Sequence, residues 1–421
     1  MLFRSLHIID PDGPHDGQTV DIRISGSTIL DIAESLSAED GEEIIALPAA
    51  YATVGFTDIG AYLGDPGHEE REDITSLRAA AAAGGYTSVV TLPNTDPVRQ
   101  SVADVAYLLR QNGDHPVDLL PAAALSINLQ GKDMTGMLEL HEAGAVVFTD
   151  GPKRRVSGSL LKRTLEYARV KGSRVMISPY DEALVPEGQM HEGPVSTGLG
   201  LRGIPNMSET IPLKRALEIL GYTQSSLIVH LLSSAAGVEE VRRAKASGLN
   251  VVATVSAHHL FFNVEELAGF DPNFKMLPPL REESDRLALI AGLKDGTIDA
   301  IVSNHVARHG EEKDLEFSYA DFGALGLQTA FRQALAVLGD DLSLGDITHL
   351  FNNAPTLLLG STTQHLRAGA QTSLALFTSG GQSTFTAADI KGKTENSPLI
   401  DRKLPGRILG VVNNGQYLPV Q

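Results

Sequence analysis

The two ends of the chain carry short alternations of apolar and polar residues, the pattern of β-strands with one buried face. Such strands are predicted at 6–9, 19–24, 28–30, 373–377, 407–412 and 416–418. The sequences Ser25-Gly26-Ser27 and Asn413-Asn414-Gly415 separate neighbouring strands, as hairpin turns do. Because the middle of the chain lacks this texture, we expect residues 1–53 and 362–421 to form one composite β subdomain.

Residues 54–361 instead repeat a short apolar run followed by a longer stretch with helical spacing. Eight strands are predicted, at 55–59, 86–92, 118–125, 145–149, 174–178, 226–232, 250–255 and 300–303. Helices are predicted at 72–83, 157–170, 208–220, 235–246 and 283–293. Eight strand-then-helix units favour a closed parallel (β/α)8 barrel. No G-x-G-x-x-G follows a strand and no G-x-x-x-x-G-K-[ST] occurs, which disfavours an open nucleotide-binding sheet.

Composition narrows the class of protein further. The chain has 421 residues, 42% hydrophobic and 20% charged, enough for one large domain with an accessory unit. Its 34 Lys and Arg against 52 Asp and Glu give a net charge of −18, which disfavours nucleic acid and anionic membranes as partners. The absence of cysteine excludes thiolate metal sites, disulfides and cysteine nucleophiles. With no export signal and no apolar run of about 18 residues, we expect a soluble, cytoplasmic protein.

The residues after the first predicted barrel strand carry a motif. Phe56-Thr57-Asp58 continues through Gly60, Tyr62 and Gly64 to Asp65-Pro66-Gly67, and Glu72-Asp73 follows. This segment resembles the pattern Pro-Gly-Phe-x-Asp-x-His-x-His-x-Arg-x-Pro-Gly of dihydroorotases in the cyclic amidohydrolase superfamily. Further segments agree in order and spacing, at 82–87, 92–97, 143–150, 190–193, 199–205, 278–281 and 295–299. The resemblance therefore spans almost the whole chain.

The resemblance implies a (β/α)8 barrel of the amidohydrolase type and a place in pyrimidine biosynthesis. In the family, zinc polarises the ring carbonyl of dihydroorotate and supplies the hydroxide that opens it to N-carbamoyl-L-aspartate. Histidines and a bridging acidic or carboxylated group hold the metal. The resemblance also implies a homo-oligomer, with a dimer as the simplest form.

This chain departs from the family pattern at the first-strand positions. The two metal histidines fall on Gly60 and Tyr62, and neither glycine nor a neutral phenol replaces an imidazole. The arginine that would grip the substrate carboxylate falls on Gly64. The metal ligands and the carboxylate clamp are therefore both missing from this segment.

Other metal positions are altered as well. After the fourth strand Asp150 is followed by Gly151 where the family has a second aspartate, and after the fifth strand Ser178 stands at a histidine position. At the sixth strand Ser233-Ser234 sets a register in which Leu231 takes the ligand position and His230 points to the other face. A one-residue bulge would instead bring His230 inward.

The general-base position holds Asn304, which cannot accept a proton near neutral pH. Leu277 replaces an asparagine that contacts substrate in the family. The retained polar residues around the barrel mouth are Asn94, His258 and His305, which we take as substrate-pocket candidates together with the altered positions Gly64 and Leu277. No confident catalytic residue remains.

Structural roles compete with functional ones for the remaining residues. His258 and His259 cannot both face one pocket if the strand continues through them, and His305 shares a face with His309 only if 306–309 is helical. We interpret Asp58 as an acidic residue at the floor of the barrel and not as a metal ligand. Asp150 and Asp181 are weak candidates for Mg²⁺ or Ca²⁺, and His230 for any metal. Lys153, near where some relatives carry a carboxylated lysine, reads as part of a solvated cationic turn.

Three functions remain open from the sequence. The preferred one is an inactive dihydroorotase homologue, without a zinc cofactor, that assembles with aspartate transcarbamoylase and supports its activity, as the resemblance implies for homologues that lost their metal histidines. The second is an active dihydroorotase or related cyclic amidohydrolase with one metal held by Asp150, His230 and Asp181. The third is a small-molecule binding barrel that performs no chemistry.

Overall fold

The structure is a computed structural model that describes residues 1–152 and 156–420. The strands are β1 (Leu2–Ile8), β2 (Thr19–Ser25), β3 (Thr28–Ala33), β4 (Ile44–Ala46), β5 (Tyr51–Val54), β6 (Phe56–Ala61), β7 (Tyr86–Thr91), β8 (Asp118–Ala123), β9 (Val147–Phe148), β10 (Val175–Ile177), β11 (Met190–His191), β12 (Gly203–Ile204), β13 (Leu227–Leu232), β14 (Val251–Ser256), β15 (Ala300–Val302), β16 (Ser373–Thr384), β17 (Lys403–Asn413) and β18 (Gln416–Pro419). The helices are α1 (Ile74–Ala83), α2 (Val102–Arg110), α3 (Met137–Glu142), α4 (Gly158–Lys171), α5 (Pro194–Leu199), α6 (Met207–Thr223), α7 (Ala235–Ala246), α8 (Ala257–Phe261), α9 (Glu283–Lys294), α10 (Gly310–Lys313), α11 (Ala330–Leu338), α12 (Leu344–His349) and α13 (Asn353–Leu358).

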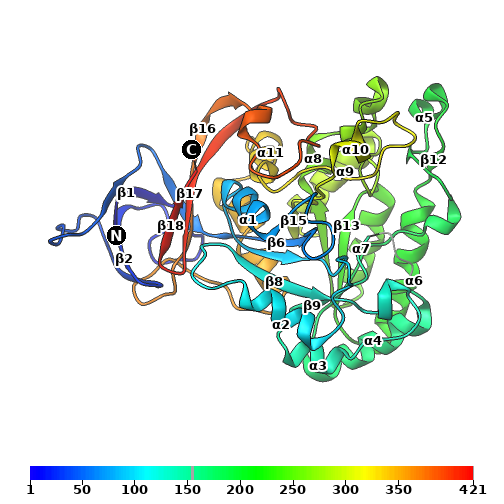
Figure 1. Cartoon of the computed structure of the whole chain (residues 1–421), viewed down its shortest axis with the longest axis horizontal. Helices are drawn as coiled ribbons and strands as arrows, with labels where there is room; N and C mark the ends of the chain where they lie inside the picture. Colours follow the sequence, from blue (N-terminus) through cyan, green and yellow to red (C-terminus); the bar gives the residue numbers. More distant parts are fainter. Residues whose placement is uncertain (153–155, 421) are drawn as a thin grey trace.

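Eight parallel strands form the central sheet, in the order β15-β14-β13-β10-β9-β8-β7-β6. Its two end strands meet where Ser303, just after β15, donates from N (2.7 Å) and Oγ (2.8 Å) to the Asp58 carboxylate on β6. Helices surround this sheet (Figure 1). The barrel predicted from eight strand-then-helix units is therefore confirmed, and each predicted strand overlaps one of these eight.

Strand alternation explains how the barrel is filled. Ile59, Val90 and Ile228 belong to an apolar cluster inside the barrel, whereas neighbours such as Val89 and Val229 pack in a larger cluster with the surrounding helices. All five side chains are at most 1% exposed. Because parallel strands in a barrel are buried on both faces, they read as continuous apolar runs rather than as alternations.

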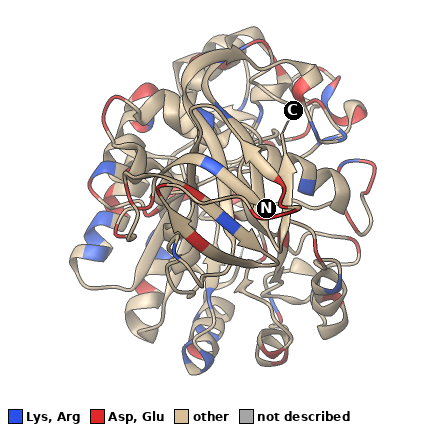
Figure 2. Cartoon of the chain, turned by 90° about the vertical axis from the view of Figure 1, so that its left-hand side faces the viewer, with Lys and Arg blue, Asp and Glu red and all other residues tan. Residues whose placement is uncertain are grey.

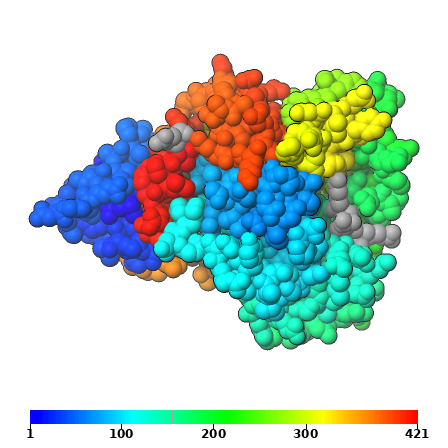
Figure 3. Space-filling model, in the orientation of Figure 1, coloured from blue at the N-terminus to red at the C-terminus, as the bar shows by residue number. Residues whose placement is uncertain are grey.

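The two termini build one second sheet, in the order β18-β17-β16-β5-β1-β2-β3, with β4 also paired to β1. Strand β5 lies between β1 from the N-terminal end and β16 from the C-terminal end. The composite sheet expected from the terminal patterns is thus confirmed. It projects to one side of the barrel, with the C-terminal strands lying beside the N-terminal ones (Figures 1 and 3).

Aromatic rings join the two bodies. Phe331 on α11 lies 4.8 Å from Phe56 at the start of β6 and 5.0 Å from Phe377 on β16, measured between ring centroids.

Lys and Arg are interspersed with Asp and Glu on the face that carries the terminal sheet (Figure 2). Within the described residues, no helix is both long and apolar enough to cross a membrane.

Candidate functional site

The carboxyl ends of the barrel strands are where a (β/α)8 barrel places its chemistry, and Gly60 lies near such an end, on β6. Its φ is +108°, a left-handed conformation that side chains other than hydrogen rarely adopt. A Cβ built on Gly60 would lie 2.7 Å from Nε2 of His230. The imidazole of His230 therefore occupies the space that a side chain at position 60 would need.

A bulge in β13 places His230 there. The pairing of β13 with β14 shifts register between Val229 and Leu232, and Leu231 has a φ of +64°. Thr254 on β14 is bound from both sides of the bulge, with its Oγ1 3.0 Å from Nδ1 of His230 and 3.1 Å from N of Leu231. The register counted from Ser233-Ser234, in which His230 points away from the barrel interior, is therefore wrong. The alternative of a one-residue bulge that brings His230 inward agrees with the structure.

His230 is an uncharged, buried imidazole. It is 1% exposed, and burial lowers the pKa of His230 to about 3. Its Nε2 has no hydrogen-bond partner among the described residues. A neutral imidazole nitrogen is a good metal ligand in principle, but a single one does not make a site.

The remaining candidates for metal binding are engaged in local structure. Asp150 accepts hydrogen bonds from N (2.8 Å) and Oγ (2.5 Å) of Ser126. Asp181 caps a short 3₁₀ turn by accepting from N of Ala183 at 3.1 Å. Asp150, Asp181 and Ser178 line one small cavity, but His230 is not among the residues that line it.

Zinc as the family uses it does not fit these residues. Across residues 1–152 and 156–420, no three His, Asp or Glu side chains are grouped so that they could hold a metal ion. The one-metal arrangement of Asp150, His230 and Asp181 is therefore not assembled. Lys153 lies outside the described residues.

Asn94 and Gly151 show a second steric replacement. Gly151, where the family has an aspartate, has a φ of +76°, and a Cβ built there would lie 2.4 Å from Oδ1 of Asn94. Asn94 Nδ2 donates to the carbonyl oxygen of Asp150 at 3.2 Å. Asn94 thus packs into the space that a side chain at position 151 would need.

The carboxylate clamp is excluded at Gly64 by backbone packing. Gly64 N donates to Glu72 O at 3.0 Å, and a Cβ at this position would lie 2.1 Å from the carbonyl oxygen of His68. No side chain can be added without moving the loop. Of the substrate-pocket candidates, Gly64 is therefore a structural glycine in this chain.

Asn304 adopts a role that a carboxylate could not. Its φ is +50°, and its Nδ2 donates to the carbonyl oxygen of Leu277 at 3.2 Å. An ionised aspartate would place an acceptor against that acceptor. The amide of Asn304 thus acts as a structural hydrogen-bond donor. Leu277 supplies the carbonyl oxygen that accepts this bond, and its side chain lines a cavity.

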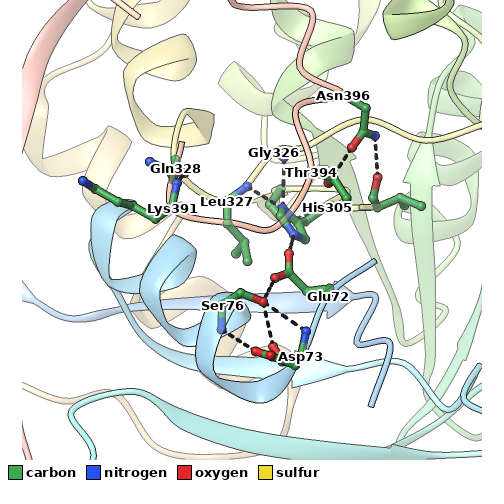
Figure 4. A network of polar contacts seen from close by, with 12 residues as sticks. Glu72, Asp73, Ser76, His305, Gly326, Leu327, Gln328, Lys391, Thr394 and Asn396 are labelled. Carbon is green, nitrogen blue, oxygen red and sulfur yellow. Dashed lines mark hydrogen bonds and ion pairs between the residues drawn. The ribbon is translucent and has the colours of Figure 1, made fainter. Parts of the chain in front are cut away.

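His305 is held in a buried network (Figure 4). Its Nε2 lies 3.0 Å from Oε2 of Glu72, and its Nδ1 is 3.2 Å from N of Gly326. Glu72 also accepts from Oγ of Ser76 in the first turn of α1. Both His305 and Glu72 are 1% exposed. His305 therefore joins the loop after β15 to α1, and its role is structural.

His258 and His259 lie on α8 instead of on a continued strand. His259 Nε2 is 3.0 Å from the carbonyl oxygen of Pro278, while the His258 ring lies 6.3 Å from that of Phe262. Desolvation lowers the pKa of His258 to about 4 and that of His259 to about 3. Both side chains are buried, so His258 packs inside the protein and does not face a substrate pocket.

Sequence reasoning missed a buried ionic cluster at the end of β13. Glu209 on α6 accepts from N of Ser233 (2.9 Å) and N of Ser234 (3.1 Å), at the start of α7. Arg281 approaches Glu209 to 3.9 Å and donates to Ser233 Oγ at 2.8 Å. The segment 278–281 that contributed to the resemblance contains this arginine, but the charged run that follows it at 282–286 gives it the appearance of a surface residue.

One open cavity of about 470 Å³ lies among the loops that follow β10, β14 and β15. Tyr180, Val185, Leu277 and Phe322 form apolar parts of its lining. Glu182 and Glu187 also belong to its rim, where the Glu187 side chain is 81% exposed and lies 3.2 Å from Arg202. We call it the mouth cavity, and no Lys, Arg or His is found among its described lining residues.

Comparison with known proteins agrees with this architecture. The family described as Dihydro-orotase-like matches residues 51–234. A protein named Dihydroorotase from Citrifermentans bemidjiense is 34% identical over 420 residues, covering 99% of each chain, and one from a Geobacter species is 35% identical with the same coverage. Among solved structures, an L-hydantoinase from Arthrobacter aurescens superposes with a TM-score of 0.85 at 20% identity, covering 99% of this chain and 95% of its own.

The (β/α)8 barrel joined to a sheet built from both termini defines the structural class of this protein, and the L-hydantoinase shares that fold. Within that class, full-length identity of about one third places the chain in the dihydroorotase family, to which it belongs. The resemblance read from the motifs is thereby confirmed.

Proposed function

We propose that this member of the dihydroorotase family does not open dihydroorotate and instead serves as a structural partner of aspartate transcarbamoylase in pyrimidine biosynthesis. The observation that carries the proposal is the contact between Gly60 and His230, in which one retained imidazole fills the volume of a missing ligand. A site that had only lost its histidines would leave that space open. Here the surrounding residues have adapted to the loss.

The adaptation extends to the other roles of the reaction. Asn304 acts as a hydrogen-bond donor at the base position, and Gly64 has no room for a clamp. Base catalysis, carboxylate binding and metal binding are separate functions, and the base position Asn304 lies on a different segment from Gly60 and Gly64. All three functions are altered while the barrel is intact. This supports a role in which the fold and the surface of the protein matter and the reaction does not.

The test combines turnover with assembly. The purified chain is assayed for dihydroorotate hydrolysis with and without added zinc, beside an active dihydroorotase as the matched control. In parallel it is co-expressed with the aspartate transcarbamoylase of the same organism and analysed by size exclusion with light scattering. We expect no turnover above background, a homodimer alone, and a complex in which transcarbamoylase activity rises.

Two results would overturn the proposal. One is zinc-dependent turnover at a rate comparable with the control enzyme. The other is a transcarbamoylase that is equally stable and equally active without this chain, together with the absence of a complex at micromolar concentrations.

A second candidate is an active dihydroorotase with a rearranged site. The names of the full-length relatives favour it, because they are called Dihydroorotase at 34–35% identity. It requires ligands other than those of the family pattern. The turnover assay separates the two candidates directly.

A further inference from the structure

A second cavity lies where the barrel meets the terminal sheet. It measures about 210 Å³, and its lining residues come from α1, α11, β16, β17 and the segments beside them. Three cationic side chains, Arg332, Lys391 and Arg407, line it together with one carboxylate, Asp389. The whole chain has 34 basic against 52 acidic residues, so this cavity carries the opposite charge to the molecule. We call it the junction cavity.

Arg332 is a buried cation whose hydrogen-bond partners are all uncharged. The residue is 8% exposed, and its Nε donates to the carbonyl oxygen of Pro405 at 3.2 Å. Its Nη2 donates to the carbonyl oxygens of Ser383 (3.2 Å) and Leu404 (2.8 Å) and to Oγ of Ser383 at 2.8 Å. Arginine is seldom buried without an anion beside it. The guanidinium therefore has a positive charge that no carboxylate of the described residues pairs with.

One nitrogen of this guanidinium is free to bind a ligand. Nη1 of Arg332 makes no hydrogen bond with a described residue, and it is not enclosed in the way that Nη2 of Arg281 is. Because the rest of Arg332 is buried and the residue lines the junction cavity, Nη1 opens onto that cavity. A buried arginine thus directs an unused charged donor into an open space.

The other two cations of the cavity are also unpaired. Lys391 and Arg407 are exposed, and neither side chain forms an ion pair or a hydrogen bond with a described residue. Asp389 is occupied in a local turn, where its Oδ2 accepts from N (2.7 Å) and Oγ1 (2.8 Å) of Thr386. Three positive charges therefore converge on the junction cavity without a matching set of carboxylates.

The fold holds this arrangement in place before any ligand binds. Gln328 Nε2 donates to the carbonyl oxygen of Asp389 at 2.9 Å, and its Oε1 accepts from N of Lys391 at 2.7 Å (Figure 4). Both ends of one amide thus fix the segment 389–391 beside the start of α11. The four hydrogen bonds of Arg332 fix its guanidinium against β16 and β17. A preformed site costs less conformational entropy on binding.

The rest of the lining indicates the class of ligand. Ser383 and Thr384 contribute hydroxyl groups, which can donate to an oxyanion, and Phe385 and Ile408 contribute apolar surface. Arginine forks match the oxygens of phosphate, and three cations suit a dianion better than a single carboxylate. A phosphate group on a small apolar or aromatic body combines these properties.

We propose that the junction cavity binds the phosphate group of a small phosphomonoester through Arg332, Lys391 and Arg407. The phosphate lies against the guanidinium of Arg332, and the organic body contacts Phe385 and Ile408. This site shares no described lining residue with the mouth cavity and involves none of the altered family positions. The proposal is independent of the transcarbamoylase partnership, because its test measures ligand binding by the full-length chain alone.

Phenyl phosphate is the probe, inorganic phosphate tests the headgroup alone, and benzoate serves as the carboxylate analogue. Calorimetry and thermal shift are run at constant ionic strength, because salt screens weak surface attraction. We expect saturable binding of both phosphates, with phenyl phosphate at least tenfold tighter than benzoate. Lys391→Gln/Arg407→Gln should weaken it tenfold or more without changing the unfolding temperature of the free protein. Lys132→Gln/Arg163→Gln, which removes the same charge from exposed positions outside the cavity, should leave binding unchanged.

A second measurement locates the site without any substitution. Lysines of the original chain are acetylated with and without phenyl phosphate, and the modified peptides are quantified by mass spectrometry. The ligand should protect Lys391 and leave Lys132 equally reactive. Unprotected Lys391 would overturn the proposal. So would full binding by Lys391→Gln/Arg407→Gln, benzoate binding as tight as that of phenyl phosphate, or no saturable binding of either phosphate.

Discussion

At the scale of single residues, two glycines that we interpret as altered metal positions lie in close contact with neighbouring side chains. Gly60 and Gly151 both have positive φ angles, and both have a neighbouring side chain within 3 Å of where their Cβ would lie. Reversion at these positions therefore meets backbone strain and steric overlap at the same time. This makes the altered site resistant to simple restoration.

Gly60→Ala should lower the free energy of unfolding by about 1–2 kcal/mol for the left-handed backbone and by roughly 1–3 kcal/mol more for crowding against His230. Urea unfolding measures the sum. Gly248→Ala is the matched control, since Gly248 has a φ of +83° and open space around its Cβ, so it reports the backbone cost alone. Equal losses in the two variants would show that His230 does not crowd position 60.

Asn304→Asp should also destabilise the protein, by about 1–3 kcal/mol, because the carbonyl oxygen of Leu277 loses its donor and faces a carboxylate. Thermal unfolding at neutral and mildly acidic pH measures this, and the loss should shrink where the new carboxyl is protonated. A variant as stable as the original at neutral pH would argue against the assigned amide orientation.

Buried histidines make the protein acid-sensitive. The pKa of His230 is lowered to about 3 and that of His191 to about 4, both from an unfolded value near 6.5. The unfolded chain therefore binds more protons below pH 6.5, and stability falls as pH drops from there toward 4. Asp58 works in the opposite sense, because burial raises its pKa.

We expect each such histidine to contribute a slope of up to about 1.4 kcal/mol per pH unit between roughly pH 6.5 and 4. His230→Gln should reduce the slope by about one proton, whereas His68→Gln, at a side chain 37% exposed, should not. Chemical unfolding at several pH values gives the slopes. Identical slopes for the original chain and His230→Gln would contradict a neutral, buried His230.

At the scale of elements, β5 depends on both ends of the chain. It pairs parallel to β1 and antiparallel to β16, and its Ala52 packs in a cluster with Leu374 and Leu376. Removing residues 373–421 would expose that cluster and leave β5 as an edge strand that pairs only with β1.

The truncated chain ending at residue 372 should therefore be insoluble or should unfold without cooperativity, although every residue of the central barrel sheet is present. Circular dichroism and limited proteolysis test this, with a chain lacking only β18 as the milder control. A truncated protein that melts cooperatively at the original temperature would show that the terminal sheet is dispensable.

At the scale of the whole molecule, the altered positions predict little metal. After purification without added zinc, we expect below about one zinc per several chains by elemental analysis, because a tetrahedral site needs ligands from several segments at once. The variant Gly60→His/Tyr62→His should still fail to turn over dihydroorotate, since Asn304 and Gly64 remain. Stoichiometric zinc in the original chain, or turnover in this variant, would contradict the reading of the site.

The linear sequence determined the eight barrel strands, the composite terminal sheet and the family, because apolar periodicity and turn residues are local properties. It also predicted that Gly60, Gly64 and Asn304 are altered functional positions, which stays a prediction. Only the tertiary structure decided which side chains surround them. Whether His230 turns inward depends on a bulge fixed by Thr254 on the neighbouring strand, and the mouth cavity depends on three loops distant in the chain. Such features follow from packing between segments, which no pattern along a single strand records.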